Sequence, residues 1–416
     1  MITKLRLQNF KNFKDAELHL GRFTLLVGEN SSGKSNIRDA FRFLHGISRG
    51  YSLADILGEK WGSGGEIQWT GIRGGTREVA FRGASSFALE VTFLVEGGKS
   101  EKEAVYRIEV DPGVSGNAPR IIDERLTVQG ENDPIFRPNR EVSSRDKFRL
   151  VLLKAGGKRL GEAFLNQQPA LSQLVEAKRL SSDVRKWAEE TMGALSDLRF
   201  LDLSPEAMRR PSLPGQTVLG DRGENLSSVL QSIYNQPSGK DILVEWLHEL
   251  TPMDAKEFEF IPDSTGKILL TLVEKNGQRT SGYSASDGTL RFLAIIAAFL
   301  GPKPAKLHFI EELDTGLHPT RLHLLLQLVE QYVANGDRQI IATTHSPQFL
   351  SVLSEQALQN ASLVYRLENQ PDAHISRIID LYDARRLFEQ YDPAELLTSG
   401  WMENTATFTS NGETTS

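Results

Sequence analysis

The segment Gly28–Ser35 has the spacing Gly-x-x-x-x-Gly-Lys-Ser, which is the pattern of a phosphate-binding loop. The apolar run at 23–27 before it predicts a buried strand, and residues 36–44 after it have helical spacing. These two elements aim backbone N–H groups and a helix N-terminus at a triphosphate, which a chance glycine-rich turn would not do. Lys34 is then expected to reach the β- and γ-phosphates, and the Ser35 hydroxyl to ligate Mg²⁺. The pattern predicts binding of a nucleoside triphosphate.

Two carboxylates end a later apolar run, at Glu311 and Glu312 after residues 307–310. In an ATPase with a phosphate-binding loop, Glu311 is expected to hold the magnesium ion through water. Successive strand residues point to opposite faces, so Glu312 is expected to point away from Glu311 and to act as general base on the attacking water. Paired acids also occur at solvated strand ends, and these two residues alone leave that alternative open.

His345 follows another buried run, residues 339–344. At the carboxyl end of a strand in an α/β sheet, a neutral imidazole can donate a hydrogen bond to the γ-phosphate. The apolar residues of 319–329 have helical spacing, so the segment reads as a strand–helix–strand crossover. The alternative is a histidine with a structural role or an exposed one.

A second anion-binding nest is predicted where Ser286, Asp287 and Gly288 open the helix at 290–296. One chain rarely needs two nests for a single triphosphate. The second nest is therefore expected to bind the nucleotide of a neighbouring subunit. An ordinary N-capped helix is the alternative.

The chain has 416 residues, no cysteine and a formal net charge of −6. Its length is enough for two or three domains. The absence of cysteine excludes disulfides, thiolate catalysis and cysteine-ligated metal centres, and it suits a cytoplasmic protein. The acidic balance argues against a general basic coat for nucleic acid. Because no apolar run reaches about 18 residues, neither a membrane span nor a membrane partner is expected.

The remaining pattern divides the chain into an N-terminal ATPase lobe with a β subdomain, a helical insert, a C-terminal ATPase lobe and a disordered tail, at 1–146, 147–200, 201–397 and 398–416. Alternating segments between residues 87 and 128 predict an antiparallel sheet. Helical spacing predicts the insert, which is too short for the sustained heptads of a coiled coil. The tail is rich in Thr, Ser, Asn and Gly, a composition typical of disorder.

In this order, the elements resemble the ATP-binding-cassette (ABC) ATPases of the SMC and RecF group, including stand-alone ATPases related to the overcoming-lysogenization-defect (OLD) family. The resemblance is carried by residues 1–50 and 280–350. It implies an α/β, ABC-type P-loop ATPase head with an antiparallel β subdomain, in which a short helical insert replaces the coiled coil. In that group Ser286–Gly288 corresponds to the signature motif, Glu311–Glu312 to the Walker B pair and His345 to the switch histidine.

The resemblance also implies roles for single residues. Lys11 is the nearest match to a basic residue that approaches the nucleotide, and Asn30 matches a residue that faces the γ-phosphate. His318 falls in the D-loop, and Gln68 is the candidate for the metal-binding Q-loop glutamine, whereas Ala285 replaces the usual signature leucine. The expected residues are Lys11, Gly28, Asn30, Ser31, Gly33, Lys34, Ser35 and Asn36 for ATP, Glu312 and His345 for catalysis, and Ser35, Glu311 and Gln68 for Mg²⁺.

The resemblance implies that two copies sandwich two ATP molecules and that hydrolysis opens this homodimer. It further implies a switch in anti-phage defence that controls a separately encoded nuclease or toxin. About 70 residues follow His345, fewer than a Toprim nuclease domain needs, and no long coiled-coil arms are expected. The alternative is a RecF-like clamp that binds DNA during repair, for which DNA binding by the isolated protein would be strong and steeply salt-dependent.

Overall fold

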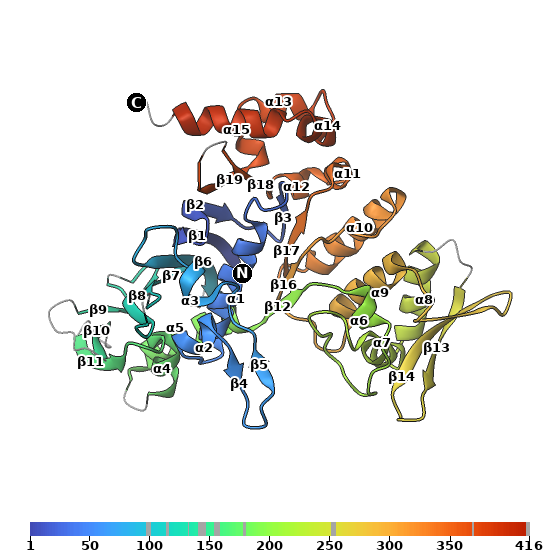
Figure 1. The fold of residues 1–416 in the computed structure, drawn as a ribbon, viewed down its shortest axis with the longest axis horizontal. Helices are drawn as coiled ribbons and strands as arrows, with labels where there is room; N and C mark the ends of the chain where they lie inside the picture. The colour runs from blue at the N-terminus through green and yellow to red at the C-terminus, as the bar shows by residue number, and fades with distance from the viewer. Residues whose placement is uncertain are drawn as a thin grey trace.

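The computed structural model describes residues 1–96, 101–113, 116–131, 133–139, 147–153, 159–177, 180–250, 255–367 and 370–412. Two large sheets organise the described chain: an antiparallel sheet built from residues of the first 165, and a mostly parallel sheet that runs through the centre of the molecule (Figure 1). The helices after residue 200 lie around the parallel sheet or at its sides. The mixed α/β class expected from the sequence is confirmed.

The antiparallel sheet has eight strands in the order β11-β10-β9-β8-β7-β6-β1-β2. Its strands are β1 (Ile2–Phe10), β2 (Phe13–His19), β6 (Phe87–Glu96), β7 (Glu101–Asp111), β8 (Arg120–Val128), β9 (Phe136–Pro138), β10 (Lys147–Leu153) and β11 (Arg159–Leu165). Alternate residues of β7 are buried, as expected for a sheet with one face on a core and one face in water. The antiparallel sheet predicted between residues 87 and 128 is present.

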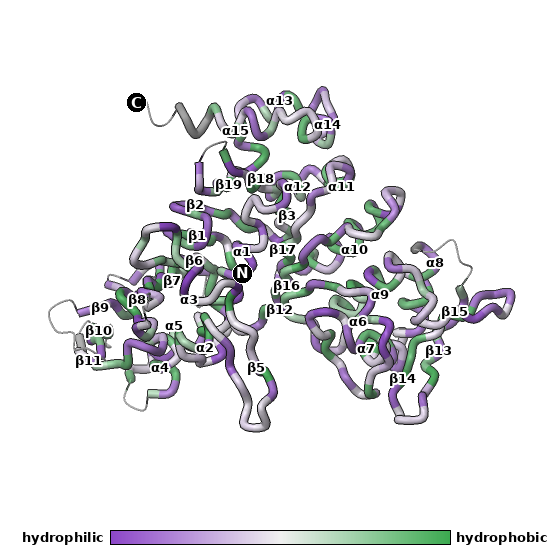
Figure 2. Tube along the Cα trace, in the orientation of Figure 1, coloured by the Kyte–Doolittle hydropathy of each residue, from purple (hydrophilic) through white to green (hydrophobic). Residues whose placement is uncertain are grey.

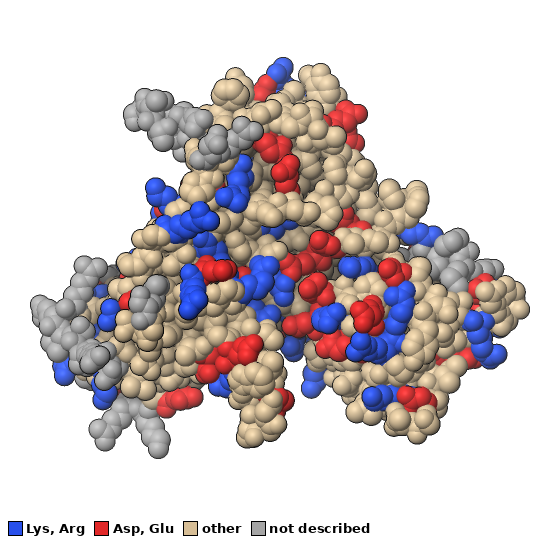
Figure 3. All heavy atoms as spheres, in the orientation of Figure 1, with Lys and Arg blue, Asp and Glu red and all other residues tan. Residues whose placement is uncertain are grey.

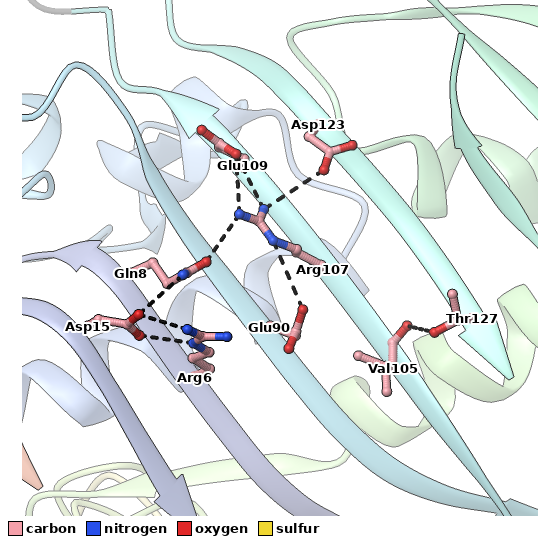
Figure 4. Close-up of polar contacts among 9 residues, drawn as sticks. All are labelled: Arg6, Gln8, Asp15, Glu90, Val105, Arg107, Glu109, Asp123 and Thr127. Atoms are coloured by element: carbon pink, nitrogen blue, oxygen red, sulfur yellow. Dashed lines mark hydrogen bonds and ion pairs between the residues drawn. The ribbon is translucent and has the colours of Figure 1, made fainter. Parts of the chain in front are cut away.

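The outer face of this sheet is held by charged pairs that run across the strands (Figure 4). Arg107 on β7 donates to Gln8 at 3.1 Å and pairs with Glu109 at 3.3 Å. The carboxylates of Asp123 and Glu90 lie 3.9 and 4.0 Å from the same guanidinium. Opposite charges on neighbouring strands stabilise a solvated face, and Arg107 joins β7 to β6 and β8 in this way.

The central sheet has six strands in the order β12-β16-β17-β3-β18-β19, all parallel except β19. The strands are β12 (Leu198–Leu201), β16 (Leu307–Ile310), β17 (Gln339–Thr344), β3 (Phe23–Val27), β18 (Ala361–Arg366) and β19 (Ala373–Arg377). Every residue of β3, β16 and β17 is buried, as in a parallel sheet covered on both faces. Hydrophobic stretches, green in Figure 2, run through this central sheet. Two smaller sheets complete the set, β4 (Lys60–Trp61) with β5 (Ile67–Trp69), and β13 (Ala255–Pro262) with β14 (Ile268–Glu274) and β15 (Arg279–Ser281).

The helices that cover the sheets are α1 (Lys34–Ser48), α2 (Leu53–Leu57), α3 (Gly75–Glu78), α4 (Ala170–Glu176), α5 (Ser182–Ser196), α6 (Pro205–Met208), α7 (Leu226–Tyr234), α8 (Gly239–Leu250), α9 (Asp287–Leu300), η2 (Pro319–Arg321), α10 (Leu322–Val333), α11 (Pro347–Ser351), α12 (Glu355–Leu358), η3 (Ile378–Asp380), α13 (Ala384–Phe388), α14 (Pro393–Thr398) and α15 (Trp401–Gly412). One buried cluster joins α1 to the antiparallel sheet, and a second surrounds α7, α9 and α10. Across the described stretches, none of the helices is long and apolar enough to cross a membrane.

The first part of the expected helical insert is a β-hairpin. Residues 147–153 and 159–165 form β10 and β11, which extend the antiparallel sheet, and helices begin only at Ala170. The prediction of helix from residue 147 was therefore wrong for this stretch. Phe148, Leu150 and Leu152 alternate with less buried neighbours, and this period of two buries one face against the core.

The expected disordered tail contains a helix. Residues 401–412 form α15, in which Met402 and Ala406 are buried, so the prediction was wrong there. The two side chains lie one turn apart and pack near Tyr365, whose hydroxyl contacts the Ala406 carbonyl at 3.5 Å. Residues 413–416 lie outside the described part of the chain.

A buried carboxylate joins the sheet to the start of α4. Glu124 on β8 accepts the N–H groups of Ala170 and Leu171 at 2.7 and 2.8 Å and the hydroxyl of Tyr106 at 2.9 Å. Burial raises the pKa of Glu124 to about 7, against the effect of these donors. The carboxylate thus satisfies two of the N–H groups that α4 leaves without a helical partner.

We expect Glu124→Ala to destabilise the fold by about 2 kcal/mol or more, because three buried donors lose their acceptor. Thermal unfolding of the nucleotide-free protein measures the change. Glu206→Ala is the control, since Glu206 is exposed and pairs only with Arg210 among the described residues. Equal midpoints for the two variants would contradict this role.

Candidate functional site

The carboxyl ends of four parallel strands meet at one edge of the central sheet. Register places Leu201 beside Ile310, Ile310 beside Ala342, and Thr344 beside Val27, so the segments that follow these strands lie next to one another. A cavity of about 530 Å³ opens there, lined by Glu29, Asn30, Ser31, Gly33, Lys34, Ser35, Asn36, Arg38, Arg73, Asp202, Glu311, Glu312, Thr343 and His345. Ligands of open α/β sheets bind at this edge.

The phosphate loop links β3 to α1, and two glycines give it its shape. Gly28 has φ +153° and Gly33 has φ +127°. A Cβ atom would lie 2.1 Å from the Val364 carbonyl at the first position, and 2.9 Å from the Asn12 side chain at the second. No side chain caps α1, and its first turn holds no acid. The N-terminus of α1 is therefore open to an anionic ligand.

The ammonium of Lys34 lies over this loop. It donates to the carbonyl of Gly28, and to that of Glu29 at 2.8 Å. Burial lowers the pKa of Lys34, and the carboxylates of Glu312, Glu29 and Glu311 oppose this shift. A half-buried cation whose hydrogen bonds, among the described residues, go to two carbonyls is well placed to receive phosphate oxygens.

The two acids after β16 line the same cavity rather than opposite faces. Glu311 and Glu312 lie beyond the last strand residue, and Glu312 has φ +48°, so the strand alternation expected for them does not apply. The N–H of Glu312 donates to Thr343 Oγ1 at 2.9 Å, and Thr315 Oγ1 donates to its carboxylate at 3.1 Å. Glu311 is half-buried and forms an ion pair with Arg38.

His345 and Asp202 complete the strand-end arrangement. His345 follows β17 and lines the cavity, where its side chain is exposed. Asp202 follows β12, is exposed, and lines the same cavity. Three lining residues, Asp202, Arg38 and Thr343, were not predicted from the sequence. Asp202 has one local signal, its position directly after an apolar strand.

Two expected site residues lie elsewhere. Gln68 is exposed on β5, in a hairpin that projects from the molecule, and its amide faces Glu66 at 3.4 Å, so the assignment of Gln68 to the metal site was wrong (Figure 1). Lys11 is buried against Asp39 at 3.4 Å and borders a neighbouring hollow. Arg73 also pairs with Asp39, at 3.1 Å. Unlike Lys11, Arg73 lines the cavity.

The signature segment and the D-loop lie apart from the cavity lining. Ser286 is the N-cap of α9, which packs with α6 and α7 on the far side of β12 and β16 from α1 (Figure 1). His318 is exposed and caps η2. Ser286, Asp287, Gly288 and His318 do not line the cavity of their own chain.

The donor set fits a magnesium ion bound together with phosphates. Ser35 and Glu311 offer hydroxyl and carboxylate oxygens in one cavity, and Mg²⁺ prefers such hard ligands. The described residues contain no cluster of three or more His, Asp or Glu side chains that could hold a metal ion. Arg38 now neutralises Glu311 and would have to release it. Acidic and basic side chains gather near the middle of the face drawn in Figure 3.

Comparison with known sequences gives matches over most of the chain. Residues 23–351 match the family described as "AAA domain, putative AbiEii toxin, Type IV TA system". An ATP/GTP phosphatase of Helicobacter pylori (strain ATCC 700392 / 26695) is 22% identical over 375 residues, covering 85% of this chain and 88% of that protein. An OLD nuclease of Thermus scotoductus (strain ATCC 700910 / SA-01) is 23% identical over 86% of this chain, which spans only 61% of the nuclease.

Two further likenesses are partial or weak. The DNA replication and repair protein RecF of Chlamydia abortus (strain DSM 27085 / S26/3) is 31% identical over 97 residues, which cover 23% of this chain and 21% of RecF. An SMC head bound to the C-winged helix domain of ScpA superimposes with a TM-score of 0.48 at 16% identity, covering 90% of this chain and 97% of that one. A TM-score below 0.5 is too low to inform on partners or activity. The sequence matches confirm an ATPase of the SMC, RecF and OLD-like group, and hence nucleotide binding and hydrolysis in general.

Proposed function

Because the chain belongs to the family of AAA domains that residues 23–351 match, we propose that it hydrolyses ATP to ADP and phosphate as a dimeric switch. Each phosphate loop would face the signature segment of the other copy. The observation that carries the proposal is the cavity itself, where the phosphate loop, both acids and His345 converge while the Ser286 nest is absent from the lining. In a symmetric dimer the second copy would bring its own Ser286 nest to this cavity.

The chain's own residues divide the reaction among them. The N-terminus of α1 and Lys34 hold the phosphates. Glu312, anchored by Thr343 and facing the cavity, takes the proton of the attacking water. His345 donates a hydrogen bond to the γ-phosphate. Ser35 and Glu311 hold Mg²⁺, which when bound neutralises charge that builds up on the transferring phosphoryl group.

Loss of the γ-phosphate would remove the group that both copies bind, so hydrolysis opens the dimer. An ATP-dependent change of this kind suits control of a separate protein. The family description names a toxin–antitoxin system, and one relative is called an OLD nuclease; both favour a nuclease or toxin as the effector, in anti-phage defence. The partial match to RecF supports the second candidate, a clamp on DNA. DNA binding that weakens steeply with salt would favour the clamp.

Mixing two inactive variants tests whether the site is shared. Ser286→Arg should block hydrolysis, because the side chain fills the space that phosphate needs at the start of α9, while ATP binding by the chain's own phosphate loop persists. Lys34→Ala should lose binding but keep its signature segment. A heterodimer then rebuilds one complete site, and ATPase activity should return in part.

Full activity of Ser286→Arg alone would overturn the shared site. Ser284→Arg is the control for a bulky cation nearby, because Ser284 is an exposed residue before the nest. Rescue is measured at increasing protein concentration, so that heterodimers form.

A further inference from the structure

The segment before α9 is held by a single arginine from another helix. Arg209 is the C-cap of α6, and its guanidinium donates to the carbonyls of Tyr283 and Ala285 at 3.2 and 2.9 Å. It also pairs with the carboxylate of Asp287 at 2.6 Å. One planar group thus contacts three alternate residues, which suits the fixed fork of an arginine and not a lysine.

These contacts fix the backbone that carries the nest. The hydroxyl of Ser286 accepts the N–H of Thr289 at 3.1 Å and so caps α9. On the other side, a Cβ atom at Gly288 would lie 2.3 Å from the Gly316 carbonyl, so the helix start also abuts the segment that leads to His318 of the D-loop. Arg209 therefore lies on one side of the nest and residues 316–317 lie on the other.

Arg209 also changes the charge of the nest. Asp287 lies in the first turn of α9 and its side chain is 61% exposed. The positive end of the helix dipole attracts anions, so a carboxylate at this position takes up that attraction and repels a phosphate. A guanidinium at 2.6 Å cancels this charge and leaves the field available to an anionic ligand.

We propose that Arg209 is a positioning residue for the shared ATP site: it sets the shape and charge of the Ser286–Gly288 nest that receives the other copy's γ-phosphate. This role rests on the proposed function, because it concerns the same composite site. Arg209 does not line the cavity of its own chain, so its effect belongs to closure of the dimer rather than to ATP binding by the monomer.

The next residue supplies a matched control. Arg210 has an exposed side chain and pairs with Glu206 at 3.1 Å, and the described residues show no contact between it and the nest. Arg209→Ala and Arg210→Ala remove the same charge one residue apart. Both residues follow the last residue of α6, so any effect of net charge is shared by the two variants.

The experiment measures ATP-dependent dimerisation by sedimentation in a Glu312→Gln background, where hydrolysis is blocked. We expect Arg209→Ala to raise the dimer dissociation constant about tenfold or more and Arg209→Lys to restore little. Arg210→Ala should leave the constant unchanged. ATP affinity of the monomer should be the same in all three variants, a result that general misfolding would not give.

A second variant separates charge from folding. In Asp287→Ala chains the repulsion is already gone, so adding Arg209→Ala should cost less than it does in the presence of Asp287. Unchanged dimerisation in Arg209→Ala, or loss of monomer ATP binding, would overturn the positioning role while the proposed function stands. Absence of any ATP-linked dimer in Glu312→Gln itself would overturn the proposed function and this role with it.

Discussion

ATP affinity is expected to fall about 100-fold in Lys34→Ala. The ammonium of Lys34 is half-buried over the phosphate loop and bonded only to carbonyls in the described structure, among them that of Glu29 at 2.8 Å. Charge-assisted hydrogen bonds to phosphate contribute about 1.5–3 kcal/mol each, and about 2.7 kcal/mol corresponds to 100-fold in affinity. Calorimetric titration with ATP and Mg²⁺ measures the change.

Lys14→Ala is the matched control for Lys34→Ala, because Lys14 is exposed on β2 outside the cavity lining. It should bind ATP as the parent does. If Lys34→Ala also binds at the parent affinity, the phosphate-loop assignment is wrong. Thermal unfolding without nucleotide should be similar for the two variants, which excludes a folding defect as the cause.

The parts of the site that were predictable are those whose chemistry depends on consecutive residues. The loop at 28–35 requires glycines at 28 and 33, and the position of His345 depends on the end of a buried run; both kinds of signal are local. Arg38 and Glu311, in contrast, form an ion pair across 273 residues of sequence, which no local spacing indicates. The contacts of Arg209 with the nest, 74 to 78 residues away, were equally hidden.

Two predictions failed for different reasons. Helical spacing is real at residues 171–188, but it does not extend back to β10, where Phe148, Leu150 and Leu152 alternate with a period of two. In α15, Met402 and Ala406 form the buried face among Thr and Asn residues that are typical of disorder. Their burial depends on β18, a strand that the composition of the tail does not indicate. Gln68 failed for a third reason: the resemblance placed it, as a glutamine that follows the first helix, and the hairpin carries it away from the cavity.

Glu312→Gln is expected to lower the ATPase rate by about 10²- to 10⁴-fold, the usual contribution of a general base, and to leave ATP affinity unchanged. The substitution keeps the shape of the side chain, so the N–H contact to Thr343 and the hydrogen bond from Thr315 can persist. The negative charge and the ability to accept a proton are lost. ATP with Mg²⁺ should then hold the variant as a closed dimer, which sedimentation detects.

A comparison of Glu311→Gln with Glu312→Gln distinguishes a metal ligand from a general base. Glu311→Gln should raise the Mg²⁺ concentration needed for half-maximal ATP hydrolysis, because it weakens an oxygen ligand, whereas Glu312→Gln should not change it. Glu389→Gln, on an exposed residue after α13, controls for loss of an acid at the surface. Hydrolysis at the parent rate in Glu312→Gln would show that another group takes the proton, and Asp202, at the adjacent strand end, would be the next carboxylate to test.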